Sequence, residues 1–130
     1  MSPPNRRVRN RCEIVTIWWR DIPTQVNGVN GAQIEKYQLS HRFLWSAQRA
    51  AKKADLMDAH SFTEQSRRTS VPLDPSSGEL LDLVWAEAAR LEALYDNVRL
   101  AALVEAGGLA AYAPEHPRPR LRIVKPGLPD

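Results

Sequence analysis

The sequence predicts an α+β protein, in which one helix packs on a small antiparallel sheet and a long helix follows. The run Cys12–Trp19 is dominated by β-branched and aromatic residues, which favour a strand. Residues 27–31 contain two Asn-Gly pairs, which favour a hairpin because these residues tolerate positive φ. Beyond residue 39, apolar residues recur at the three-to-four spacing of amphipathic helices. A chain of 130 residues fits one domain.

The predicted strands lie in the first part of the chain. The stretch Arg20-Asp21-Ile22-Pro23 breaks the strand over Cys12–Trp19. Because proline has no amide hydrogen for a sheet ladder, Pro23 is expected at a bend, a bulge or a strand start. A short strand is expected over 24–26, before the turn, and a third over 32–38. Residues 67–73 are expected to form an edge strand or a linker.

Two helices are predicted. Ser40 is the candidate N-cap of the first, whose apolar stripe comprises Phe43, Leu44, Ala47, Ala50, Ala51 and Ala54. Asp74 and Pro75 suit the start of the second, and Gly107-Gly108 its end. Its apolar seam comprises Leu81, Val84, Ala88, Leu91, Tyr95, Val98 and Ala102.

The second helix would be roughly 40 Å long, which exceeds the width of such a domain. Two interpretations of its uncovered apolar surface stay open. The preferred one is an interface with another chain, formed by Leu81, Val84, Leu91, Tyr95 and Val98. The other is a bent or broken helix.

The composition divides the chain into four segments. These are a basic N-terminal arm over 1–11, an α+β domain over 12–73, the long amphipathic helix over 74–108 and a Pro-rich basic C-terminal arm over 109–130. The net charge of +3 comes from the two ends, so the middle of the chain is mildly acidic. The arms could therefore lie along an acidic partner or, less favourably, along a phosphate backbone.

Composition also bounds the cellular setting. A single cysteine excludes an internal disulfide and a Cys-based zinc site. No apolar run approaches the roughly 18 residues of a membrane span, and no secretory signal is visible. A cytoplasmic protein that does not bind membranes is the simplest expectation.

No catalytic or cofactor motif is present. The glycines form neither GxGxxG nor a P-loop, and HExxH and GxSxG are missing. Asp55, Asp58 and His60 could form a loose metal site, but a solvated helix end explains them better. The sequence therefore predicts no metal and no cofactor, and favours a protein that is not an enzyme.

Two groups of residues are candidate sites. The first is the Trp-Arg-Asp corner, Trp19, Arg20 and Asp21, with Gln25 nearby. Arg20 could stack on a tryptophan and pair with a carboxylate, which would form a contact for a ligand or partner. The favoured alternative is that Arg20 and Asp21 stabilise the turn and the tryptophans fill the core.

The second group is a basic face on the first helix, formed by Arg42, Trp45, Arg49 and Lys52. An aromatic ring among cations can stack on a base or anchor a protein interface. The slightly favoured alternative is a solvated helix face with one covered tryptophan.

The stretch Trp19-Arg20-Asp21-Ile22-Pro23-Thr24-Gln25-Val26 resembles the signature of a small bacterial virulence factor domain family (conserved virulence factor C-type), which reads Trp-Arg-Asp-Ile-Pro-Ala-Gln-Val. The resemblance covers about residues 13–72 and includes Gly28, Gly31, Lys36, Arg42-Phe43 and Ala50-Ala51. Thr24 replaces the usual Ala, and Trp45 lies on a face that is polar in the family. The family name implies no reaction, but its relatives are often encoded near one-carbon and corrinoid-dependent methyl-transfer genes, which implies an accessory role there.

The preferred function is therefore a non-catalytic accessory or adaptor subunit that docks on a larger protein partner, or that forms a homo-oligomer. One alternative is a nucleic-acid-associated protein that uses the basic arms. The other is a small ligand-binding protein or enzyme at the Trp-Arg-Asp corner.

Overall fold

A computed structural model describes residues 11–113, and it confirms the α+β class. The strands are β1 (Cys12–Trp19), β2 (Ile22–Asn30), β3 (Gln33–Gln38) and β4 (Ser66–Pro72). The α-helices are α2 (His41–Lys53), α3 (Ala59–Glu64), α4 (Leu80–Leu94) and α5 (Asn97–Glu105), and the short 3-10 helices are η1 (Pro75–Ser77) and η2 (Ala110–Tyr112). Of the predicted arms over 1–11 and 109–130, residues 1–10 and 114–130 lie outside the described residues, and the start of the second arm forms η2.

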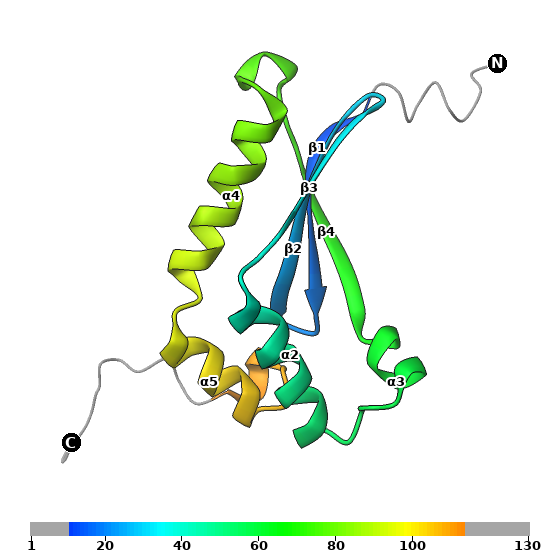
Figure 1. Cartoon of the computed structure of the whole chain (residues 1–130), viewed down its shortest axis with the longest axis vertical. Coiled ribbons are helices and arrows are strands. Elements are labelled where there is room, and N and C mark those ends of the chain that lie inside the picture. The colour runs from blue at the N-terminus through cyan, green and yellow to red at the C-terminus, as the bar shows by residue number, and fades with distance from the viewer. Residues whose placement is uncertain (1–10, 114–130) are drawn as a thin grey trace.

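The four strands form one antiparallel sheet in the order β3-β2-β1-β4. Helix α4 lies along one face of the sheet, and α2, α3 and α5 gather at the end remote from the β2–β3 turn (Figure 1). The strand predicted over Cys12–Trp19 is confirmed as β1.

The second strand is longer than the short strand expected over 24–26. The Asn27-Gly28 pair lies inside β2, and the turn forms only at Gly31, where φ is +62°. Gly28 permits a close approach of α4, because a Cβ atom built there would lie 2.5 Å from Cγ2 of Val84. Packing against a helix therefore overrides the local turn preference of Asn-Gly.

The segment over 74–108 forms η1, α4 and α5, so the prediction of one continuous helix is wrong and the alternative of a broken helix is confirmed. Tyr95 leaves the helical conformation (φ −100°, ψ 72°). Asp96 then caps α5 by accepting a hydrogen bond from the backbone N–H of Arg99 at 2.8 Å. The break lets α5 turn away from α4 and pack on α2 (Figure 1).

One hydrophobic core joins the sheet to the helices. Val26 of β2, Phe43 of α2 and Val84 of α4 have no exposed surface, and Leu91 is only 1% exposed. These residues belong to a single cluster of packed side chains. The residues before and after position 73 therefore share one core, although the sequence analysis ended the α+β domain there and began a separate helix.

Candidate functional site

Arg20 lies in the tight turn between β1 and β2, with φ at +52°. Its guanidinium lies over the Trp19 ring, 5.4 Å from the ring centre. Its Nε donates to Oε1 of Gln65 at 3.0 Å, and its Nη1 donates to the carbonyl of Gly107 at 3.0 Å. The expected stacking on tryptophan is therefore confirmed, but the polar partners of Arg20 are an amide and a carbonyl in place of a carboxylate.

Asp21 joins the same turn to two distant segments. Its Oδ1 accepts from Nη2 of Arg67 at 2.9 Å, and its Oδ2 accepts from the backbone N–H of Ala110 at 2.7 Å. Its own N–H donates to the carbonyl of Gly108 at 2.9 Å. Because Arg67 lies on β4 and Gly108 follows α5, Asp21 ties both segments to the end of β1.

Trp19 packs beneath the turn that holds Arg20 and Asp21, and it is 2% exposed. Its ring stacks on Phe62 at 5.2 Å, and its Nε1 donates to the Phe62 carbonyl at 2.8 Å. Gln25 lies apart on β2, where its amide donates to Asn27. The corner therefore holds the fold together, in line with the structural alternative drawn from the sequence.

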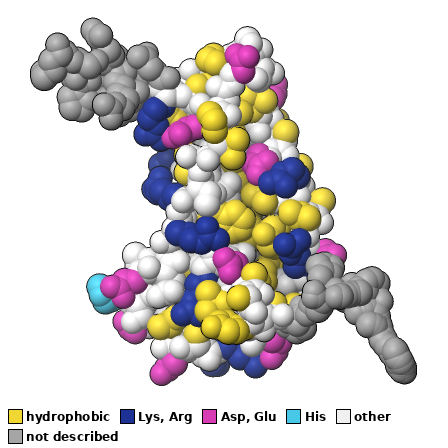
Figure 2. All heavy atoms as spheres, turned by 180° about the vertical axis from the view of Figure 1, so that it is seen from behind, with side chains coloured by type: hydrophobic (Ala, Val, Ile, Leu, Met, Phe, Trp, Pro, Cys, Tyr) yellow, Lys and Arg dark blue, Asp and Glu magenta, His cyan; other side chains and the backbone are white. Residues whose placement is uncertain are grey.

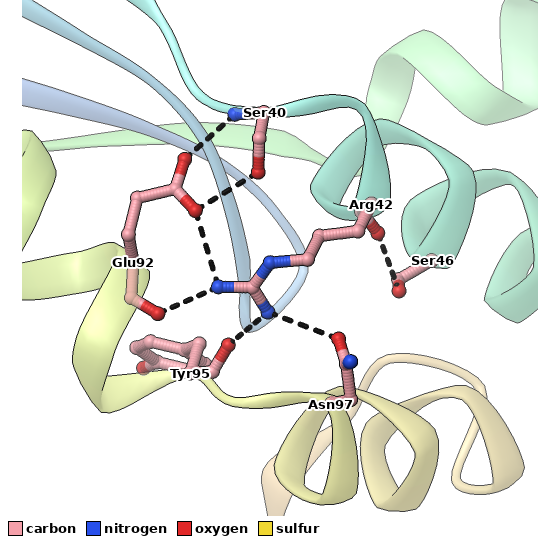
Figure 3. Close-up of polar contacts among 6 residues, drawn as sticks. All are labelled: Ser40, Arg42, Ser46, Glu92, Tyr95 and Asn97. Carbon is pink, nitrogen blue, oxygen red and sulfur yellow. Dashed lines mark hydrogen bonds and ion pairs between the residues drawn. The ribbon is translucent and has the colours of Figure 1, made fainter.

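Arg42 of the basic face is also engaged by the fold (Figure 3). Its Nη1 donates to the carbonyl of Tyr95 at 2.5 Å, and its Nη2 donates to the carbonyl of Glu92 at 2.6 Å. Both carbonyls lie at the C-terminal end of α4, where the helix has no amide partners for them. Arg42 thus caps α4 with a positive charge, which the helix dipole favours.

Glu92 makes the reciprocal contact to α2 (Figure 3). Its Oε2 accepts from the backbone N–H of Ser40 at 2.7 Å, and its Oε1 accepts from the Ser40 hydroxyl at 2.9 Å and from Nη2 of Arg42 at 3.1 Å. Burial raises the pKa of Glu92, but the hydrogen bonds from Ser40 and Arg42 outweigh it, so this pKa lies below its usual value. Ser40 stands at the predicted cap position, although its side chain binds Glu92 and makes no cap hydrogen bond.

Three residues of the basic face, Arg42, Trp45 and Arg49, line a groove between α2 and α5, which we call the α2–α5 groove. The groove measures about 230 Å³ and is lined by Arg42, Trp45, Ser46, Arg49, Asn97, Leu100, Ala101, Val104 and Glu105. Trp45 is 64% exposed. Within the described residues, Arg49 and Lys52 make no hydrogen bond or ion pair with another side chain. At one end, Lys53 pairs with Glu105 at 2.9 Å.

The five predicted interface residues of the long helix separate into two groups. Val84, Leu91 and Tyr95 are buried in the core of their own chain, so the prediction that they contact a partner is wrong. Leu81 and Val98 are exposed. The seam with the strongest helical period faces the sheet because that face buries the most apolar area.

Trp85 is an exposed residue that the sequence seam did not include. It lies on α4 and is 52% exposed. Because it falls between the seam positions, it points away from the core. The sequence did carry a signal for this exposed residue, namely a large aromatic side chain between the seam positions.

Residues 11–113 contain no group of three or more His, Cys, Asp or Glu side chains placed to hold a metal ion. Within the same span, no helix combines the length and the apolar character needed to cross a bilayer.

Comparison with known proteins gives one family. The family model described as "Virulence factor" matches residues 17–104, which is more than half of the chain. The match includes α4 and α5, which lie beyond the stretch that carries the resemblance in the sequence. No curated protein and no solved structure matches the chain. The turn that Trp19, Arg20 and Asp21 brace and the helix ends that Arg42 and Glu92 cap all lie in the matched region, and the chain belongs to the virulence factor family.

Proposed function

We propose that this protein is a non-catalytic accessory subunit that docks onto a larger protein through the α2–α5 groove. The observation that carries the proposal is Trp45, which is 64% exposed beside Arg49, a residue that makes no ion pair within residues 11–113. Exposing a tryptophan to water costs free energy, whereas tryptophan and arginine are the residues most enriched at the centres of protein interfaces.

The size of the groove supports a side-chain anchor over a small molecule. Sites for small molecules usually measure about 300–1,000 Å³, and the groove measures about 230 Å³. A space of this size suits one large apolar side chain that a partner inserts between Trp45 and Ala101. Arg49, which lines the groove, then places a positive charge beside the anchor.

The charge on α2 indicates the character of the partner. The helix carries Arg42, Arg49, Lys52 and Lys53 and no acidic residue. Arg42 and Lys53 already have carboxylate partners, so Arg49 and Lys52 remain to contact acidic groups. An acidic surface with one protruding apolar side chain complements this face.

Exposed apolar residues continue outside the groove. In Figure 2, hydrophobic side chains form a broken band down one face of the molecule, with Lys and Arg side chains on both sides. Val71 and Leu94 are 63% and 44% exposed. Exposed apolar residues that gather on one face favour a role in assembly.

Affinity capture from native lysate tests the proposal. The wild type is compared with the double variant Trp45→Ala/Arg49→Glu and with the control Trp85→Ala, which truncates the other exposed tryptophan. We expect a protein that the wild type and control recover and the double variant loses, with circular dichroism showing that all three fold. The family resemblance suggests enzymes of one-carbon and corrinoid-dependent methyl transfer as the first candidates, in the cytoplasm.

Two results would contradict the proposal. One is recovery of the same proteins by the double variant. The other is binding of a single-stranded oligonucleotide that Trp45→Ala abolishes and that weakens steeply as salt increases, because the partner would then be a nucleic acid.

A further inference from the structure

We propose that two copies of this chain pair through β3 and form a two-fold symmetric dimer with one continuous antiparallel sheet. The dimer uses the side of α4 that bears Trp85 and leaves the α2–α5 groove free. It therefore goes beyond the proposed function, and either can fail without the other.

The first support is the edge of the sheet. Within the described residues, β3 has one neighbour, β2, and all its residues except Glu35 are exposed. The N–H of Leu39 donates to the carbonyl of Thr24 at 3.0 Å. Since hydrogen-bonded and non-bonded pairs alternate along antiparallel strands, the N–H and C=O groups of Lys36 and Gln38 point away from β2. An edge with free backbone groups is a template for another strand.

The second support is a groove between this edge and α4. It measures about 650 Å³, and Ala89 and Ala93 are among its lining residues. Trp85 and Tyr37, which are 52% and 39% exposed, also line it. The same surface therefore carries a projecting tryptophan and a depression between small residues.

A two-fold interface requires a surface that complements itself. The β3 edge meets this condition, because an antiparallel pair can form between two identical strands. The Trp85 surface meets it too, because each tryptophan can pack over Ala89 and Ala93 of the other copy. This is why the occupant is a second copy of the chain.

Charge selects the register of the two strands. An axis perpendicular to the sheet must pass beside one residue of β3, so that equivalent residues face each other. Centring it on Glu35 or Lys36 would oppose two like charges, which is destabilising. Centring it on Ile34 would separate the two Tyr37 residues by about 20 Å and keep the grooves apart. Centring it on Gln33 or Gln38, the two ends of β3, would leave only that one residue opposite β3 of the other copy. The axis therefore lies at Tyr37.

This register makes specific contacts. Lys36 of each copy exchanges two backbone hydrogen bonds with Gln38 of the other copy, because both point their polar groups outward. Tyr37 faces Tyr37 of the other copy as a non-hydrogen-bonded pair, with Cα atoms about 4.5 Å apart. The two α4 helices then lie on the same face of the joined sheet, with Trp85 between them.

Substitutions at Lys36 test the backbone pairing by sedimentation equilibrium from 1 to 200 µM. Lys36→Pro removes the outward N–H, which β2 does not use, so the monomer keeps its fold. Lys36→Ala keeps this N–H and is the matched control. We expect the mass of the wild type and of Lys36→Ala to approach that of two chains, and the dissociation constant of Lys36→Pro to rise at least about tenfold.

Cysteine cross-linking tests the register in a Cys12→Ser background. A non-hydrogen-bonded antiparallel pair has the Cα separation that a disulfide requires, so Tyr37→Cys should form a covalent dimer under mild oxidation. Ile34→Cys is the control and should stay monomeric under denaturing conditions. A disulfide through position 34 in place of 37 would overturn the register.

The tryptophans complete the test. Trp85→Ala should raise the dissociation constant at least about tenfold, because it removes an aromatic anchor, whereas Trp45→Ala should leave it unchanged. The mass of one chain for the wild type at 200 µM would overturn the proposal, and so would equal dissociation constants for Lys36→Pro and Lys36→Ala. The wild type could prove monomeric while the Trp45→Ala/Arg49→Glu variant still fails to recover the partner protein. That pair of results would refute the dimer and leave the proposed function intact.

Discussion

Arg42 and Glu92 each stabilise the end of the helix that carries the other residue. Arg42 on α2 binds the last free carbonyls of α4, and Glu92 on α4 binds the first free N–H of α2. Their side chains also meet at 3.1 Å. The charges match the two helix dipoles, positive at a C-terminus and negative at an N-terminus, so the arrangement fixes how α2 and α4 meet.

Glu92→Gln should lower stability at neutral pH and remove a pH-dependent part of it. Because the pKa of Glu92 lies below its usual value in the folded protein, its contribution is present above the unfolded value of about 4.3. The contribution is lost as the pH falls through the folded value. Urea unfolding at pH 7 and pH 3 should show wild type and variant converging at the lower pH. A constant difference between them would contradict this role.

Arg42→Ala should lower the free energy of unfolding by about 2–3 kcal/mol, because it leaves two carbonyls of α4 and the carboxylate of Glu92 without their charged donor. Arg49→Ala on the same helix is the control and should change it by less than about 0.5 kcal/mol. Chemical denaturation of both variants provides the measurement. Equal losses would show that Arg42 is only another surface arginine.

Gly108→Ala should destabilise the protein by about 2–4 kcal/mol. A Cβ atom there would lie 2.7 Å from Cζ3 of Trp19, and the residue has φ of +89°, so overpacking adds to backbone strain. Gly107→Ala, with φ of +67° and its nearest neighbour at 3.4 Å, should cost only about 1 kcal/mol. Thermal unfolding should rank the two in this order; the reverse order would contradict the packing argument.

Gly28→Ala should lower stability by about 1–3 kcal/mol, because its Cβ would collide with Val84 of α4. Adding Val84→Ala removes the nearest of the two colliding side chains and leaves Leu80, whose Cδ1 would lie 2.8 Å from the new Cβ. The double variant should then lose at least about 1 kcal/mol less than the sum of the single variants. Strict additivity in this double-mutant cycle would mean that Gly28 serves another purpose.

Asp21→Ala should lower the melting temperature of the protein alone, without any ligand. The substitution removes the acceptor for Arg67 and for the N–H of Ala110. We expect a loss of about 1–3 kcal/mol by calorimetry. An unchanged melting temperature would contradict the stabilising role of Asp21 and would favour a ligand-binding role for the Trp-Arg-Asp corner.

The sequence predicts those elements whose signals are local. The run Cys12–Trp19 became β1 because its β-branched and aromatic residues fit the pleated, half-buried surface of a sheet. The cations around Trp45 indicated the polar face of the first helix, but the slightly favoured expectation that this tryptophan is covered is wrong, because it is 64% exposed. Asp96 was a local signal for the start of a second helix. The spacing of apolar residues continues across this position, however, so the sequence analysis did not place the break between α4 and α5 there.

Other features depend on residues that are distant in the chain. The role of Gly28 follows from Val84, and that of Arg42 from Glu92, fifty positions later. Neither partner can be identified without the fold. The partners of Arg20 and Asp21 could not be predicted either, because Gln65 and Arg67 lie far along the chain from them.

The core that passes through Val26, Phe43, Val84 and Leu91 has a genetic consequence. A premature stop codon between β4 and α4 would leave strands whose apolar side has lost the cover of α4, and proteases would clear such a product. We expect truncating alleles across this interval to behave as complete null alleles, with no partially active fragment.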